Sequence, residues 1–149
     1  MTLFDELVEV VGALDAAGVE YALVGGLAVA VWGAPRATKD IDLLVRPEAL
    51  DGALAAAAQH GFDLRAMPMT FRDGMKLQRT SRAQGGQLLT IDFIVVDANL
   101  EPAWQSRLQL ASGDRKLWVI SRDALIAMKA LAARPQDVAD IERLQDIDR

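Results

Sequence analysis

Hydrophobic residues recur along the chain with two different spacings, one typical of helices and one typical of strands. Residues 3–17 carry apolar side chains at helical intervals, and Gly18 follows where a left-handed residue would end that helix. The pattern and its flanking residues predict helices over 3–17, 27–32, 47–59, about 101–110, 122–133 and from Pro135 onward. The predicted strands are 21–24, 40–45, 88–96 and 116–120, with one or two more between 64 and 79.

This mixture of strands and helices predicts an α/β or α+β fold, in which a mixed sheet of about four to six strands is flanked by helices. The chain has 149 residues and shows no repeat or linker, so we expect a single domain over residues 1–149. Charged residues interrupt every apolar run, and the first residues lack the basic start of a secretion signal. We therefore expect no membrane span and a cytoplasmic location.

Composition excludes several kinds of chemistry. The chain has no cysteine and only one histidine, His60, which rules out disulfides, thiolate zinc sites, cysteine nucleophiles and histidine-rich metal clusters. The net charge of −5 argues against a general nucleic-acid coat. Residues 65–82 nevertheless carry five basic side chains against one acid, which predicts either an anion-binding face or the solvated side of a hairpin.

Acidic residues interrupt the two most apolar predicted strands. Side chains alternate between the faces of a strand, so Asp40 and Asp42 point to the face opposite Ile41. Asp92 lies midway along 88–96, where a charge is costly unless it is paired or binds a metal. If the two strands are neighbours, the three carboxylates converge. Three acids without His or Cys are the donor set expected for Mg²⁺ or Mn²⁺, whereas the alternatives are a solvated pair and an Asp92–Arg salt bridge.

A glycine pair, Gly25-Gly26, separates the strand at 21–24 from the helix at 27–32. Glycines let a phosphate approach the backbone, and the first turn of a helix offers free N–H groups. The same pair is also typical of an ordinary tight turn. Together with the acids, it predicts an anion site beside a divalent-cation site, as a nucleoside triphosphate with Mg²⁺ requires.

The glycine pair and the run Gly33-Ala34-Pro35-Arg36-Ala37-Thr38-Lys39-Asp40-Ile41-Asp42-Leu43 resemble the nucleotidyltransferase superfamily shared with DNA polymerase beta. Within it, the sequence is most similar to small bacterial proteins of the AbiEii-type toxin group. The resemblance implies that Asp40, Asp42 and Asp92 are catalytic metal ligands. It departs at Gly26, where many active members have a serine that contacts a phosphate.

The resemblance also implies a reaction, the transfer of a nucleoside monophosphate from an NTP to an acceptor, with Mg²⁺ or Mn²⁺ as cofactor. The residues expected near the nucleotide are Gly25, Gly26, Arg36, Thr38 and Lys129. Arg36 could bind phosphate or pair with a carboxylate, and Thr38 could bond only to its own turn. Lys129 could contact the NTP or simply pack its stem. Asp137 and Asp140 are expected on the surface of the last helix.

The acceptor stays open between RNA, a protein and a small molecule, and the basic segment Arg65–Arg82 could hold an RNA acceptor or the triphosphate. A non-catalytic regulator of the same fold, such as one half of a toxin–antitoxin pair, is the alternative function, and a metal-dependent nuclease is a third. A protein partner or a homodimer is compatible with the apolar helix faces.

Overall fold

The computed structural model describes residues 2–34, 38–132 and 134–147. The helices are α1 (Leu3–Ala16), α2 (Gly25–Val31), α3 (Leu50–Gln59), α4 (Glu101–Gln105), α5 (Arg122–Ala132) and α6 (Pro135–Gln145), and the 3-10 turn η1 (Pro47–Ala49) leads into α3. The strands are β1 (Ala22–Val24), β2 (Asp40–Val45), β3 (Leu64–Arg65), β4 (Met69–Thr70), β5 (Lys76–Gln84), β6 (Gln87–Val95), β7 (Leu108–Ser112) and β8 (Arg115–Val119).

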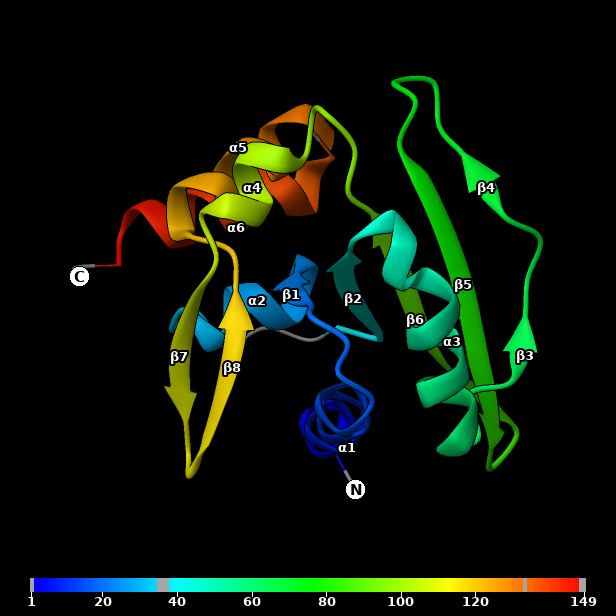
Figure 1. Cartoon of the computed structure of the whole chain (residues 1–149). Helices are drawn as coiled ribbons and strands as arrows, with labels where there is room; N and C mark the ends of the chain where they lie inside the picture. Colours follow the sequence, from blue (N-terminus) through cyan, green and yellow to red (C-terminus); the bar gives the residue numbers. More distant parts are fainter. Residues whose placement is uncertain (1, 35–37, 133, 148–149) are drawn as a thin grey trace.

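One mixed sheet runs through the molecule (Figure 1). Its strand order is β3-β5-β6-β2-β1-β8-β7, and β4 also pairs with β5. The pairs β2–β6 and β1–β8 are parallel, whereas β1–β2, β5–β6 and β7–β8 are antiparallel. The expected mixed sheet flanked by helices is confirmed, and β2 has the predicted bounds.

The side chains of β2 alternate between the hydrophobic core and the opposite face of the sheet. Ile41 and Leu43 are buried in the hydrophobic core, while Asp40 and Asp42 on the opposite face are only partly buried. The helices α1 and α3 pack against each other, and α1 also contacts β2. Thr2 caps α1, because its hydroxyl accepts a hydrogen bond from the Asp5 backbone N–H.

The sheet has eight strands, more than the four to six predicted. The helix predicted over about 101–110 ends at Gln105, and residues 108–112 form β7 instead. Leu108 and Leu110 alternate with exposed Gln109 and Ala111, which is a strand period over too few residues to stand out from a helix. Gly113, with φ of 64°, makes the tight turn into β8. The segment 64–79, where one or two strands were predicted, contains the short β3 and β4 and the start of β5.

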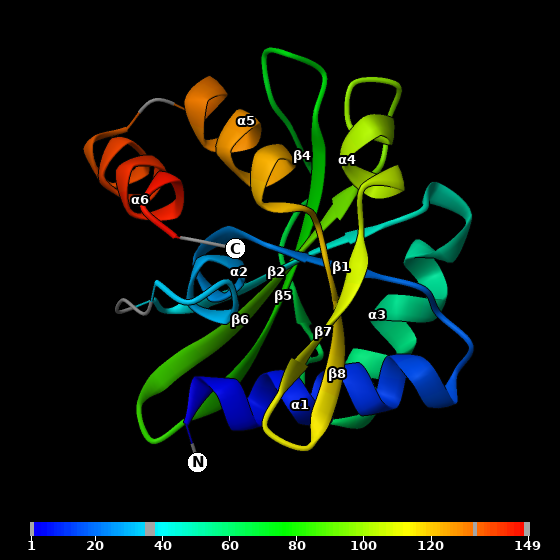
Figure 2. The ribbon, with the colours of Figure 1, turned by 90° about the vertical axis from the view of Figure 1, so that its left-hand side faces the viewer.

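The helices divide between two ends of the molecule. In Figure 1, α4, α5 and α6 lie at the top, beyond the end of β8, and α1 lies at the bottom. Figure 2 shows α6 beside α5, on the other side of α5 from α4. The helix α5 contacts α2, α4 and α6, so these four helices frame one end of the sheet. Within the described ranges, no helix combines the length and apolar character needed to cross a bilayer.

Candidate active site

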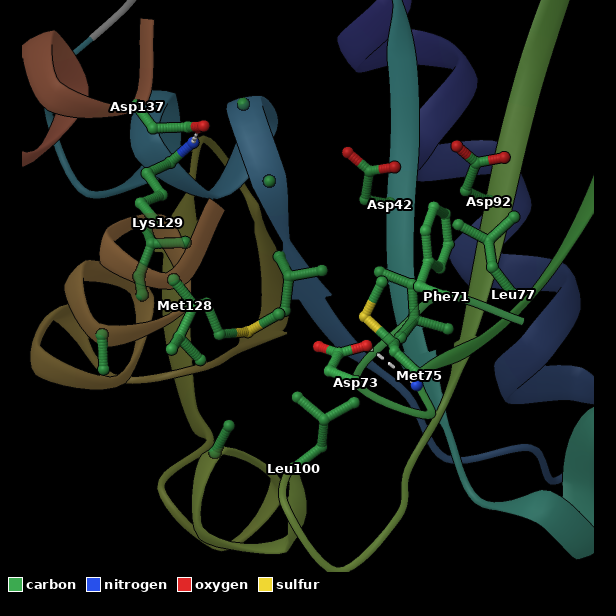
Figure 3. A pocket seen from close by; sticks show the side chains of 18 of the residues that line it. Asp42, Phe71, Asp73, Met75, Leu77, Asp92, Leu100, Met128, Lys129 and Asp137 are labelled. Carbon is green, nitrogen blue, oxygen red and sulfur yellow. Dashed lines mark hydrogen bonds and ion pairs between the residues drawn. The ribbon is translucent and has the colours of Figure 1, made fainter. Parts of the chain in front are cut away.

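A row of paired positions crosses the middle of the sheet. Val24 at the end of β1 pairs with Asp42 of β2, and Asp42 pairs with Asp92 of β6. Asp92 in turn pairs with Arg79 of β5. Paired positions on neighbouring strands point to the same face, and Figure 3 shows the Asp42 and Asp92 carboxylates side by side. The expectation that both acids share one face of adjacent strands is therefore confirmed. Asp40 lies two residues before Asp42, on the same face.

Burial and nearby acids raise the pKa values of Asp42 and Asp40. The pKa of Asp42 rises to about 7, first because the group is buried and then because Asp92 and Asp40 are near, while Lys129 and Arg79 act in the opposite direction. The pKa of Asp40 is also raised, mainly by burial and then by Asp92. The part of the sheet around these acids therefore has too little positive charge to offset its carboxylates.

Arg79 holds both oxygens of Asp92. Its Nε donates to Oδ1 at 2.8 Å and its Nη2 donates to Oδ2 at 3.0 Å, so the pair is bidentate. Asp92 is 4% exposed, whereas the Arg79 side chain is 42% exposed. The Asp92–Arg salt bridge, one of the two readings that the sequence left open, is thus present in the structure. Arg79 is a site residue that the sequence offered only as part of a basic segment.

Gly25 fits against Asp42 because it has no side chain. Its φ is 72°, a left-handed conformation that other residues adopt at a cost. A Cβ at this position would lie 2.2 Å from Oδ2 of Asp42. Gly26 follows as a buried residue in the first turn of α2. The glycine pair therefore makes the turn from β1 into α2, and it also lets that turn approach the acids closely.

The other residues expected near the nucleotide differ in whether the structure places them in the cleft. Thr38 is partly buried and lines the same cleft as the acids. Arg36 lies outside the described residues, so its expected contact stays a prediction. Lys129 also lines the cleft, but it is 6% exposed and its ammonium is 2.9 Å from Asp140 and 3.5 Å from Asp137.

The surface position expected for Asp137 and Asp140 is wrong. Each is 1% exposed, because they form the buried face of α6 together with Leu144. Arg134 at the start of α6 also pairs with Asp137. The spacing of the three buried residues, at i, i+3 and i+7, is that of a core-facing stripe, which the acidic character of two of them concealed.

Asp40, Asp42 and Asp92 line one cleft together with α5 and α6, and its volume is about 1110 Å³ (Figure 3). This exceeds the roughly 300–1,000 Å³ usual for a small-molecule site. One end holds the acids, the glycine pair and Lys129. The other end is largely apolar and lies between the β4–β5 hairpin and the helices α4 and α5. The only signal for this second end in the sequence is weak, a segment rich in Met and Arg before β5.

The basic segment Arg65–Arg82 does not form one free anion-binding face. Arg79 is engaged by Asp92, and Arg82 is 2.6 Å from buried Glu6 and lies over the Phe62 ring. Arg65 and Arg72 remain exposed. The segment runs from the end of β3 through β4 into β5, and its cations divide between structural pairs and solvent.

The donor chemistry of the acids fits a divalent cation. Asp40, Asp42 and Asp92 offer carboxylate oxygens, which Mg²⁺ and Mn²⁺ prefer, and burial followed by the nearby Asp92 and Asp40 raises the pKa of Asp42. Within residues 2–34, 38–132 and 134–147, no three acidic, His or Cys side chains already stand where they could hold a metal ion. Each Asp92 oxygen accepts one hydrogen bond from Arg79, so Arg79 competes with a metal ion for Asp92.

The sequence comparison identifies the family of the chain. Residues 1–148 match the family described as "Nucleotidyltransferase of unknown function (DUF6036)". The chain belongs to this family. No curated protein sequence matches it. The closer kinship with AbiEii-type proteins stays a prediction.

Solved structures with low sequence identity share the fold. A lincomycin-bound lincosamide antibiotic adenylyltransferase, LnuA, superposes with a TM-score of 0.70 at 17% identity, covering 97% of both chains. The protein ANT(2")-Ia, in complex with adenylyl-2"-tobramycin, superposes with a TM-score of 0.67 at 18% identity, covering 97% of this chain and 88% of the other. At these identities the likeness establishes the fold of the present chain.

Proposed function

We propose that this protein transfers a nucleoside monophosphate from an NTP to an acceptor hydroxyl, with Mg²⁺ or Mn²⁺ as its cofactor. The observation that carries the proposal is the β2–β6 register, which sets Asp42 opposite Asp92 with Asp40 on the same face, beside Gly25. Membership of a nucleotidyltransferase family supports it. An intracellular nucleotide substrate also fits the cytoplasmic location expected from the sequence.

The reaction is a displacement at the α-phosphorus. The acceptor oxygen forms a bond to this phosphorus as the bond to the oxygen bridging the β-phosphate breaks, and pyrophosphate leaves with that electron pair. The acceptor proton passes to Asp92, the carboxylate nearer to β5. Gly25 and Gly26 let the phosphates approach the backbone, and Thr38, Lys129 and Arg36 are proposed to contact the nucleotide.

Asp40, Asp42 and Asp92 would hold the divalent cation, which when bound neutralises charge on the reacting phosphates. Without it, the same acids would repel an NTP, because Asp42 and its neighbours concentrate negative charge at the end of the cleft where the phosphates must lie. Nucleotide binding should therefore depend on the metal.

The direct test is incubation of the protein with each α-labelled NTP, Mg²⁺ or Mn²⁺, and total cellular RNA, protein and small molecules. The proposal expects label to move to one acceptor fraction with release of pyrophosphate, and the Asp42→Ala variant to lose this transfer. An active Asp42→Ala variant would refute the assigned site. In a toxin–antitoxin setting, the label would move to a cellular RNA or protein, whereas an antibiotic-like acceptor would appear among small molecules.

A second candidate function is a non-catalytic regulator with the same fold. The bidentate Arg79–Asp92 pair favours it, because this pair occupies the oxygens that a metal would need. Titration of Mn²⁺ with a non-hydrolysable NTP separates the two functions, with Arg79→Gln as the informative variant. The enzyme predicts binding by the wild type, strengthened in Arg79→Gln. Failure of both proteins to bind would support the regulator.

A further inference from the structure

The two ends of the cleft have opposite chemistry. The acids, the glycine pair and Lys129 make one end polar. The other end is lined by apolar side chains from separate parts of the chain: Met69, Phe71, Met75, Leu77, Leu100 and Met128. We call this second end the apolar chamber. Figure 3 shows Phe71, Met75 and Leu77 on one side of it, with Met128 and Leu100 on the others.

The hairpin between β4 and β5 holds its part of the chamber in a fixed shape. The Phe71 N–H donates to the Met75 carbonyl at 2.8 Å, and the Gly74 N–H donates to the Phe71 carbonyl at 2.9 Å. The Met75 N–H donates to Asp73 at 3.0 Å. Phe71 is nevertheless 44% exposed, so part of its ring is open to solvent and available for contact. A preformed apolar surface of this kind is typical of a ligand site.

The geometry of phosphoryl transfer says which substrate belongs there. The attacking and leaving oxygens lie roughly in line through the α-phosphorus. If pyrophosphate leaves toward the glycine pair and Lys129, the acceptor must approach from the opposite side of the acids. Asp42 on β2 lies against Gly25, whereas Asp92 on β6 lies beside β5. The opposite side is therefore the β5 side, where Phe71, Met75 and Leu77 line the cleft.

We infer that the apolar chamber is the acceptor site, and that the acceptor is a small molecule with an apolar body and a reactive hydroxyl, uncharged or weakly cationic. This inference rests on the nucleotidyltransferase function proposed above. The cleft volume of about 1110 Å³ leaves room for such a molecule beside a nucleotide.

The charges around the chamber argue against a nucleic-acid acceptor. Asp73 and Asp97 stand at its rim, and each is fixed by accepting a backbone hydrogen bond, from Met75 and Leu100 respectively. Arg72 is the exposed cation near them. The phosphates of a nucleic-acid backbone would be repelled by these acids as well as by Asp40, Asp42 and Asp92. An uncharged apolar body would not be repelled by them.

A neutral fluorescent probe, N-phenyl-1-naphthylamine, tests the chamber without knowledge of the acceptor. The wild-type protein should bind it, and binding should persist when Mn²⁺ and a non-hydrolysable ATP analogue saturate the nucleotide site. Met75→Asp should weaken probe binding about tenfold or more, because a charge replaces an apolar contact. Met67→Asp is the matched control, since Met67 is 82% exposed and lies outside the cleft lining.

Phe71→Ala is the second variant, because its side chain is partly exposed and its loss leaves the turn's backbone bonds in place. It should also weaken the probe, and thermal melting verifies that each variant is folded. Competition between the probe and the nucleotide would instead make the chamber the nucleobase site and would overturn the inference. Equal probe binding by Met75→Asp and Met67→Asp would also overturn it.

The α-labelled NTP experiment gives the final arm. The inference expects label in the small-molecule fraction, with Phe71→Ala raising the acceptor KM while the calorimetric Kd for the metal–nucleotide complex stays unchanged. Label in RNA or protein, unaffected by Phe71→Ala, would refute the acceptor class and leave the transferase function standing. Absence of any nucleotide binding would refute the transferase function itself, whatever the probe does.

Discussion

Asp42 has a carboxyl group that the fold buries among other acids, and this has a consequence for stability without metal. Its pKa rises from 3.8 to about 7 on folding, through burial and then through Asp92 and Asp40. Between these values the unfolded chain has lost the proton while the folded protein keeps it. Because the folded state binds more protons there, stability falls as the pH rises through this window.

We therefore predict that the metal-free protein loses stability between about pH 4 and pH 7, and that Asp42→Asn loses less. Urea denaturation in EDTA at pH 5 and pH 8 measures the difference. Asp63→Asn, at an exposed position outside the cleft lining, is the control and should follow the wild type. An Asp42→Asn variant with the wild-type pH dependence would contradict the burial of this charge.

Gly25 offers a second test at the residue scale, because the chain contains a matched glycine. Gly18 and Gly25 both have φ of 72°, but a Cβ would meet nothing within 4 Å at Gly18 and would lie 2.2 Å from Asp42 at Gly25. Gly18→Ala should cost roughly 1–2 kcal/mol for its left-handed backbone, and Gly25→Ala roughly 1–3 kcal/mol more for the overlap.

Denaturant unfolding of both alanine variants measures this difference, and the double variant Gly25→Ala, Asp42→Ala should recover most of it. Equal destabilisation by the two glycine substitutions would mean that the turn does not press against Asp42. Nucleotide binding should also weaken in Gly25→Ala, because the displaced carboxylate is one of the proposed metal ligands.

At the scale of elements, the predictions from the sequence were most accurate where a single hydrophobic pattern dominated a segment. The bounds of β2 and the shared face of Asp40 and Asp42 follow from alternation alone. The missing strand was β7, because Leu108 and Leu110 follow a short helix and continue its apolar pattern. That Asp42 stands opposite Asp92 depends on which strands are neighbours, and nothing within either strand encodes this.

The sequence did not predict the burial of Asp137 and Asp140 on α6, because their partner Lys129 lies on a different helix, α5. We predict that Lys129→Met destabilises the protein by about 3–5 kcal/mol, because it leaves Asp137 and Asp140 buried without their shared cation. Adding Asp140→Asn to this variant should restore part of the loss. Urea denaturation measures both effects.

Lys116→Met, at an exposed position on β8, is the control and should change stability little. If Lys129→Met were as stable as this control, the contact of α5 with α6 would not depend on the buried pair. Because α6 borders the cleft, loss of the pair should also weaken nucleotide binding, and calorimetry with Mn²⁺ and a non-hydrolysable NTP measures that second effect.

At the scale of the whole molecule, the cleft joins parts of the chain that the sequence keeps far apart. The acids come from β2 and β6, and the opposite wall comes from α5 and α6. The apolar chamber is formed by β4, β5 and the hairpin between them, with Leu100 before α4 and Met128 of α5. A ligand that spans the cleft contacts all of these elements only when the protein is folded. Its binding energy must therefore appear as stability of the entire fold.

We predict that Mn²⁺ with an ATP analogue carrying a methylene bridge between its α- and β-phosphates raises the melting temperature. At one hundred times the dissociation constant the gain is about 2.7 kcal/mol. For a protein of this size that corresponds to roughly 5–10 °C. In EDTA the analogue should have little effect, because the unneutralised acids repel its phosphates. Differential scanning calorimetry makes the measurement.

Asp42→Asn should lose most of this shift, while Asp63→Asn should keep it, because Asp63 is exposed and lies outside the cleft lining. A full shift in Asp42→Asn would place the nucleotide away from the acids. A shift in EDTA as large as that with Mn²⁺ would mean that the protein binds the nucleotide without a metal. Either result would separate nucleotide binding from the carboxylate row across β2 and β6.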